Sequence, residues 1–402
     1  MKRRFLVVFI LICCVASMGF AASANEDLEI YMYLYENSRT VTDQFNILLV
    51  LQTRKLTGAG EFYAKAFNRL VNQIPNIQRS APAVEKSAAD DLAQTLAVLI
   101  GEEKYVTAAP DLWRAVGAFS APLVKAEALI SLGKLRATEF LDPVIRVLTD
   151  LNAAPPRGQE EAIAKGQVAR GAIIALEKFR DEAGYLPVFI MSVGGYPERI
   201  KELAKVTLPI ILEDPSALLT EQVIKSSSYA PSIKFVALQT IESANAPSAS
   251  KATAAVASLS EGWRATTNDV RQRGEVARMR KTSIDMIRRY GTTDSAVYPL
   301  LERSYKEGLD DDEKLIAIQT LGTIASEDSA KNLNSFLMIL IGKMQSGAIT
   351  RTEGDMLRAI INAIGVAGKA SSRSPLRAVI DSSTATNAVK TLANDALAKL
   401  PQ

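Results

Sequence analysis

A short helical motif recurs along this chain and constrains its fold more than any other feature. Residues 124–133 read VKAEALISLG, and residues 314–322 read KLIAIQTLG. In both segments a basic residue is followed at fixed offsets by Ala, a small polar residue, Leu and Gly. A helical unit that returns every few dozen residues is typical of repeat proteins, in which neighbouring units bury one another's apolar faces. Weaker copies of the motif lie at residues 168–177, 233–242 and 279–288.

The Leu or Ile near the end of each motif copy marks one unit, and we call these residues the anchors. The gap between neighbouring anchors varies from 29 residues (212 to 241) to 49 residues (51 to 100). No run of alternating apolar and polar residues is long enough to predict a strand. The chain is therefore expected to be all-α, with about eight or nine helix pairs. The anchors are Leu51, Ile100, Leu132, Leu176, Leu212, Ile241, Ile287, Leu321 and Ile364.

Local signals predict how the helices begin and how closely they pack. Asp142-Pro143, Asp214-Pro215 and Ser374-Pro375 are typical of helix starts, because an acceptor side chain precedes a proline that needs no hydrogen bond in the first turn. Small residues within the motif are expected where helices of adjacent units approach closely. The glycines near the motif's end indicate either close packing or a bend. These small residues are Ala128, Ala172, Ala237 and Ala317, with Gly133, Gly322 and Gly365.

The first 24 residues have the pattern of a secretory signal peptide. Three basic residues follow Met1, an apolar stretch covers residues 5–20, and small residues precede a cleavage site near Ala24. As a helix this stretch would be about 24 Å long, which is short for a hydrocarbon core of about 30 Å. We therefore expect export, with a periplasmic or secreted mature protein. The alternatives are an uncleaved anchor, or a lipid anchor at Cys13 or Cys14.

Removing the signal peptide changes the charge balance. The chain has 47 Lys+Arg and 44 Asp+Glu, and its first 24 residues contain three basic and no acidic side chains. The mature chain therefore carries 44 of each sign (47 − 3 = 44). Because the excess of positive charge belongs to the export signal, we do not expect nucleic-acid binding. Membrane contact is expected to be peripheral at most.

The lack of histidine, and of cysteine after cleavage, excludes several kinds of chemistry. Both cysteines lie in the signal peptide, and the chain contains no histidine. The mature protein can form no disulfide, no zinc site of the Cys/His kind and no Ser–His–Asp triad. A carboxylate pair or a Ser–Lys dyad stays open. We expect no catalytic residue, cofactor or metal, and we expect the acidic run 310–313 to cap a helix rather than bind calcium.

The motif resembles the second helix of a HEAT repeat in its short bacterial form. The residues that carry the resemblance are Val124, Lys125, Ala128, Leu132 and Gly133, then Ala317, Leu321 and Gly322 with Asp311 and Asp312 before the helix. The resemblance covers residues 85–402, which it implies form a right-handed α-α superhelix with a concave binding face. Residues 25–84 then form a divergent N-terminal capping region. Family members are mostly scaffolds and adaptors; some bacterial ones are lyases for bilin pigments, which fits an exported protein poorly.

Seven aromatic residues crowd the first mature segment of a chain that is only 6% aromatic. Large side chains at this position are expected to cover the exposed end of a helical stack. A docking surface is the alternative, because aromatic residues are favoured at interface hot spots. The seven are Tyr31, Tyr33, Tyr35, Phe45, Phe62, Tyr63 and Phe67.

One basic stretch is the candidate partner-binding site. The simpler interpretation is a solvated helix face that is partly paired with Glu275 and Asp285. The alternative is a binding patch for an acidic protein, an anionic lipid or an acidic glycan. We expect an exported, non-enzymatic scaffold that binds a protein partner in the bacterial envelope. An envelope-polymer binding module, or a lyase or hydrolase on a helical scaffold, is the alternative. The candidate residues are Arg271, Arg273, Arg278, Arg280, Lys281, Arg288 and Arg289.

Overall fold

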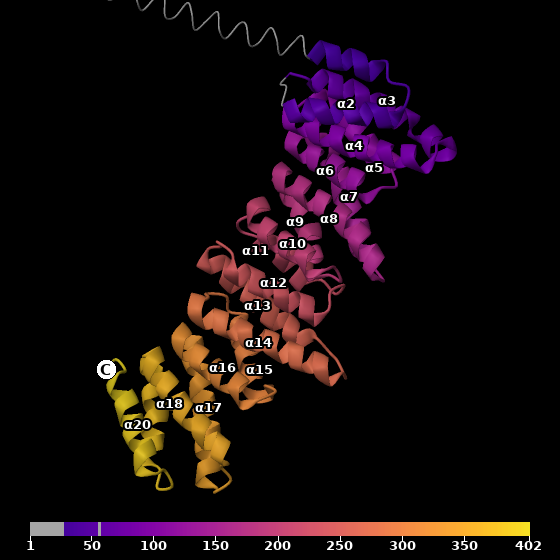
Figure 1. Cartoon of the computed structure of the whole chain (residues 1–402). Helices are drawn as coiled ribbons and strands as arrows, with labels where there is room; N and C mark the ends of the chain where they lie inside the picture. Colours follow the sequence, from indigo (N-terminus) through magenta and orange to yellow (C-terminus); the bar gives the residue numbers. More distant parts are fainter. Residues whose placement is uncertain (1–27, 55–57) are drawn as a thin grey trace, which may run out of the picture. The chain divides into compact units, whose positions relative to one another are not determined.

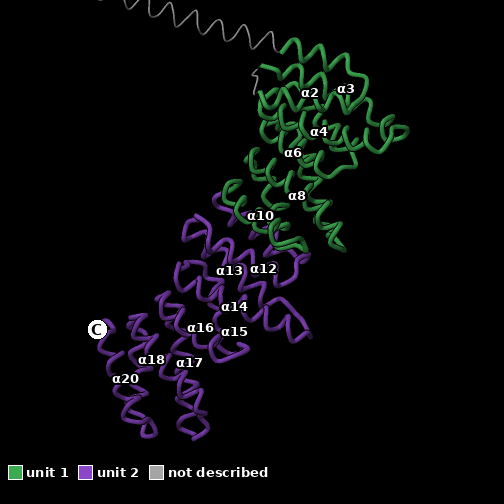
Figure 2. Tube along the Cα trace, viewed as in Figure 1, with its two compact units in different colours: residues 1–212 green, residues 213–402 purple. Residues whose placement is uncertain are grey.

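A computed structural model describes residues 28–54 and 58–402, so the predicted signal peptide lies outside the described residues. All regular secondary structure in this described part is helical, which confirms the all-α prediction. Within the same ranges, none of the helices is long and apolar enough to cross a membrane. The chain divides into two compact units, Met1–Leu212 and Glu213–Gln402 (Figure 2).

Unit 1 consists of helices packed in two layers (Figure 1). The even-numbered helices α2 to α10 contact one another in succession, and α3, α5, α7 and α9 each pack against the even-numbered helix that follows. A further helix over residues 28–36 precedes them. The bounds are α2 (Val41–Arg54), α3 (Gly60–Ser80), α4 (Ala83–Glu103), α5 (Ala109–Ala118), α6 (Pro122–Leu135), α7 (Leu141–Ala153), α8 (Gln159–Phe179), α9 (Tyr185–Val193) and α10 (Glu198–Ile211).

Unit 2 repeats this arrangement. Helices α12, α14, α16, α18 and α20 contact one another in succession, while α13, α15, α17 and α19 each pack on the next helix along the chain. A π-helical turn over Thr220–Ile224 follows α11. The bounds are α11 (Ser216–Leu219), α12 (Pro231–Ser243), α13 (Ser248–Arg264), α14 (Val270–Tyr290), α15 (Val297–Glu307), α16 (Asp311–Ile324), α17 (Glu327–Gln345), α18 (Arg351–Ala367), α19 (Arg373–Asp381) and α20 (Asn387–Ala398).

The predicted anchors are core residues of the even-numbered helices, with one exception. Eight of them are at most 1% exposed. Leu212 is wrong as an anchor: α10 ends at Ile211, and Leu212 follows it in an extended conformation, partly exposed. The buried side chain at that turn belongs to Ile211.

Most anchors also lie one turn before the end of their helix. In six helices the residue four positions after the anchor has a positive φ and donates its backbone N–H to the anchor's carbonyl oxygen. Such left-handed C-terminal residues are usually glycine, because other side chains crowd the backbone there. Three of the six are basic, and a cation next to the free carbonyls of a helix C-terminus offsets part of this strain. The six residues are Lys104, Arg136, Arg180, Gly291, Ala325 and Gly368.

The motif glycines mark close packing between helices of the same layer. A Cβ added at Gly133 in α6 would lie 2.7 Å from the Cα of Ala175 in α8. At Gly322 in α16 it would lie 2.8 Å from the carbonyl oxygen of Ala363 in α18. Real Cβ atoms do not approach backbone so closely, so only glycine permits these helices to touch. Of the two roles predicted for these glycines, the structure therefore shows close packing.

Each predicted helix start differs from the observed one by one or two residues. Asp214 accepts a hydrogen bond from the backbone N–H of Ser216, the first residue of α11. At the other two positions the helix begins two residues earlier than predicted, because 3₁₀ turns lead directly into α7 and α19. Asp142 and Ser374 therefore lie inside the first helical turn instead of before it.

The N-terminal aromatic residues divide between core and surface. The four that are buried include Tyr35 and Phe62, whose rings meet edge to face with centroids 5.2 Å apart. Tyr33 is 67% exposed. The buried four are Tyr35, Phe62, Tyr63 and Phe67.

Candidate functional site

The seven predicted basic residues all lie on α14, but the structure separates them into different surroundings. Arg271, Arg273 and Arg278 point to solvent. The side chain of Arg280, in contrast, is only 10% exposed. Residues that form one cluster of like charges in the sequence are therefore divided between the protein surface and its interior.

Arg280 forms a buried, bidentate ion pair with Glu313 of α16. Its Nε and one terminal nitrogen donate to the two carboxylate oxygens at 2.6 and 2.9 Å, and the Glu313 side chain is 0% exposed. The same carboxylate accepts from the backbone N–H of Leu309 at 3.0 Å. This pair uses the charge of Arg280 to join α14 to α16, and the contact of Arg280 with a partner stays a prediction.

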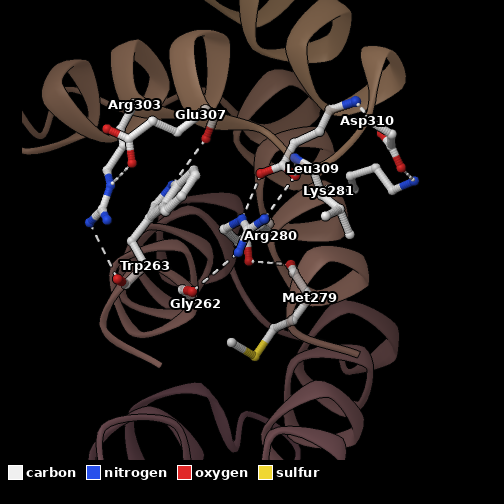
Figure 3. A network of polar contacts seen from close by, with 12 residues as sticks. Gly262, Trp263, Met279, Arg280, Lys281, Arg303, Glu307, Leu309 and Asp310 are labelled. Carbon is white, nitrogen blue, oxygen red and sulfur yellow. Dashed lines mark hydrogen bonds and ion pairs between the residues drawn. The ribbon is translucent and has the colours of Figure 1, made fainter. Parts of the chain in front are cut away.

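Trp263, at the end of α13, lies between two guanidinium groups (Figure 3). The Arg280 and Arg303 Cζ atoms stand 4.1 and 4.5 Å from the ring centroid. The indole N–H donates to the Ser304 hydroxyl at 3.1 Å, and Arg303 also forms an ion pair with Glu307 at 2.8 Å. Cation–π contacts and hydrogen bonds thus hold α13 against both α14 and α15.

Lys281 contacts the acidic run at the start of α16. Its Nζ lies 2.9 Å from a carboxylate oxygen of Asp310, which also accepts from the backbone N–H of Glu313 and so caps the helix. Partial burial raises the pKa of Asp310, but these two hydrogen bonds outweigh it and the pKa lies below its usual value. The prediction that this run caps a helix is confirmed. Within residues 28–54 and 58–402, no cluster of three or more acidic side chains could hold a metal ion.

The exposed side of α14 is a stripe of mixed charge. Arg271 lies 3.5 Å from Glu275, and Arg289 lies 2.9 Å from Asp285. Arg289 also pairs with Glu242 of α12, and this hydrogen bond raises the pKa of the guanidinium. The neighbouring Arg288 donates to Asp285 at 2.6 Å. Most of the positive charge of this stretch is thus neutralised by neighbouring carboxylates, as expected for a solvated and partly paired helix face.

Two basic residues of α14 are left without an ion pair in the part of the chain that the structure describes. They are Arg273 and Arg278, and both are exposed. Arg278 has a weak aromatic contact, its Cζ lying 6.0 Å from the ring centroid of Phe235 in α12. These two guanidinium groups can still accept carboxylates from another molecule.

Sequence reasoning missed a polar groove in unit 1. It lies between α3, α5 and the 3₁₀ turn that precedes α5, and has a volume of about 620 Å³. A signal for it exists in the sequence: Asn68 and Asn72 are four residues apart on α3, which puts both amides on one helix face. Asp111, the partner of Asn68, is too distant along the chain for any local pattern to connect the two.

Two searches for related proteins give no match. No protein-family model matches this chain, and a search of curated proteins finds no match. The resemblance to HEAT repeats therefore stays a proposal that depends on this chain's own residues.

Proposed function

We propose that this protein is an exported, non-enzymatic scaffold or adaptor that binds a protein partner in the bacterial envelope. The observation that carries the proposal is the repeated packing of same-layer helices in each unit, α4–α6–α8 in one and α14–α16–α18 in the other. Repeats of this kind present side chains from successive helices as one broad surface, which suits macromolecules better than small substrates. The predicted signal peptide supports the location.

The proposed architecture is a right-handed α-α superhelix of the HEAT type, with about eight or nine helix pairs. The buried anchors and the contacts at Gly133 and Gly322 support it, because they recur at equivalent motif positions. A compact globule of the 378 mature residues (402 − 24) would have a radius of gyration of about 21 Å. We expect small-angle scattering to give a clearly larger value; one close to 21 Å would contradict the superhelix.

The proposed contact region is the exposed side of α14 around Arg273 and Arg278, the two residues whose charges are not neutralised by neighbouring carboxylates. A partner with exposed Asp or Glu side chains would complement them. Arg280, Lys281, Arg288 and Arg289 already hold carboxylates of this chain, so we place the contact at Arg273 and Arg278 instead.

Photo-crosslinking in intact cells tests this proposal. A photoreactive amino acid replaces Arg278 in one full-length variant and Arg79, an exposed residue of α3, in a control variant. We expect one dominant envelope protein to crosslink at position 278 and not at 79. The double substitution Arg273→Glu/Arg278→Glu should reduce its recovery more than tenfold, because facing like charges are strongly unfavourable. Recovery of wall fragments or lipid alone, or of the same proteins from both positions, would contradict it.

A further inference from the structure

The polar groove of unit 1 has the size and the fixed hydrogen-bonding groups of a ligand site. Its volume of about 620 Å³ lies within the range of about 300–1,000 Å³ that is usual for small-molecule sites. All its lining residues belong to unit 1, so the site is complete without any contribution from the second unit.

Four side chains beside the groove form a closed ring of hydrogen bonds. Asn68 donates to both carboxylate oxygens of Asp111 at 2.9 Å, and Arg114 donates to the same carboxylate at 2.9 Å. Arg114 also donates to the Asn72 carbonyl oxygen, and Asn72 donates back to Asn68 at 3.0 Å. Because each side chain is held by two others, a ligand would meet groups that are already ordered, which reduces the entropy lost on binding.

Two polar side chains next to this ring have unused hydrogen-bonding capacity. Arg69 and Gln73 follow Asn68 and Asn72 along α3, line the groove and are exposed. Neither has a hydrogen-bond partner among the residues that the structure describes. Together they offer the five N–H donors of a guanidinium and both the donors and the acceptor of an amide.

The groove and Arg114 beside it together carry no net charge. Its carboxylates are Glu36, Glu61 and Asp111, and its cations are Lys65 and Arg69, with Arg114 holding Asp111 from the side. Lys65 and Glu61 neutralise each other at 2.7 Å. Three charges of each sign favour neither an anion nor a cation. A neutral ligand with many donors and acceptors fits this balance best.

An aromatic ring forms one edge of the groove. Tyr105 packs against the start of α3, where a Cβ on Gly60 would come within 3.0 Å of the Tyr105 ring. Glycine at this position therefore gives the ring room to lie close to the helix. Aromatic rings in polar sites supply an apolar face for the C–H groups of a ligand.

We propose that this groove binds a neutral polyhydroxylated chain, namely a short oligosaccharide segment such as cell-wall glycan presents. Hydroxyl groups on a sugar both donate and accept, which matches the mixture of carboxylate, amide and guanidinium groups, and the C–H face of a sugar ring matches Tyr105. The proposal goes beyond the proposed function: it concerns a different unit and ligand class from the α14 surface, and either can fail without the other.

Isothermal titration of the full-length mature chain tests the proposal, with chitotetraose and cellotetraose as probes and tetra-alanine as the peptide comparison. We expect binding of at least one saccharide with a Kd near 1 mM and no binding of the peptide. Arg69→Ala and Gln73→Ala should each weaken binding about tenfold, because each removes hydrogen bonds made only with the ligand. Arg79→Ala, on the same helix but outside the groove, should leave the Kd unchanged.

A second variant tests the aromatic edge. Gly60→Ala displaces the Tyr105 ring and should weaken saccharide binding, while circular dichroism reports whether the helices remain folded. The proposal is overturned if neither saccharide binds up to 10 times the expected Kd, if tetra-alanine binds instead, or if Arg69→Ala and Arg79→Ala have the same effect on folded protein.

Discussion

Arg280 and Glu313 place two full charges where water has little access. Taking ions out of water is unfavourable, and the bidentate geometry, the extra hydrogen bond from Leu309 and the Trp263 ring beside Arg280 compensate for it. Lys234, at the equivalent motif position in α12, pairs in a similar way with Glu261 at 3.2 Å. The basic position of the motif therefore holds neighbouring helices together in at least these two copies of the motif.

Breaking the buried pair should be strongly destabilising. Glu313→Gln keeps an acceptor for Leu309 but leaves the Arg280 charge uncompensated, and we expect the free energy of unfolding to fall by about 3–5 kcal/mol. The double substitution Arg280→Met/Glu313→Gln removes that charge and should recover part of the loss. Urea unfolding measures both. A change below 1 kcal/mol in Glu313→Gln would show that the pair is solvated in solution.

Glu353 should make stability depend on acidity. Hydrogen bonds from Lys343 and from the backbone N–H of Thr350 lower the pKa of Glu353 to about 2. A carboxyl whose pKa is depressed in the folded state stabilises it above the unfolded pKa of about 4.5, and this contribution disappears as the pH falls toward 2. The melting temperature of Glu353→Gln should therefore lie below that of the parent at pH 7 and converge with it near pH 2.

At the scale of helices, glycine decides how closely neighbours in one layer approach. The α6–α8 crossing uses it twice: a Cβ at Gly133 would meet Ala175, and one at Gly171 would lie 2.6 Å from the carbonyl oxygen of Ala126. Each helix thus places a glycine against an alanine of the other. Helix propensity alone would disfavour both glycines, so the packing they permit must outweigh that loss.

Alanine substitutions separate packing from propensity. Gly133→Ala and Gly322→Ala should each destabilise by about 1–3 kcal/mol or more, because the new methyl group forces two backbones apart. Gly274, in the second turn of α14, has nothing within 4 Å of the added Cβ, so Gly274→Ala should instead stabilise by about 0.5–1 kcal/mol. Chemical denaturation of the three variants measures this. Equal effects of all three would refute the close-contact explanation.

The sequence predicted features that depend on nearby residues and missed those that depend on distant ones. Helix class, eight of the nine anchors and the Asp310 cap follow from patterns within a few residues, and these are found. The partners of Arg280 and Asn68 lie 33 and 43 residues away along the chain, so no local pattern shows that Arg280 is buried or that the groove exists. A sequence does not show which helices pack together, so a charged residue with a partner cannot be distinguished from one without.

At the scale of the whole molecule, the chain divides at the place where the helical motif is interrupted. The division falls between Leu212 and Glu213, next to the one anchor that is not a core residue. The short α11 and its π-helical turn follow, in place of a helix of ordinary length. The sequence shows weak flanks here but no linker, so the division is a property of packing rather than of composition.

Each unit contains one of the chain's two tryptophans: Trp113 lies in α5, and Trp263 ends α13. Trp113→Phe and Trp263→Phe would therefore each leave a single intrinsic fluorophore confined to one unit. Unfolding of unit 2 would release the indole of Trp263 from the two guanidinium groups beside it and alter its emission. Fluorescence recorded on the two variants during the same denaturation can thus show whether the units melt together or in sequence, without any attached dye.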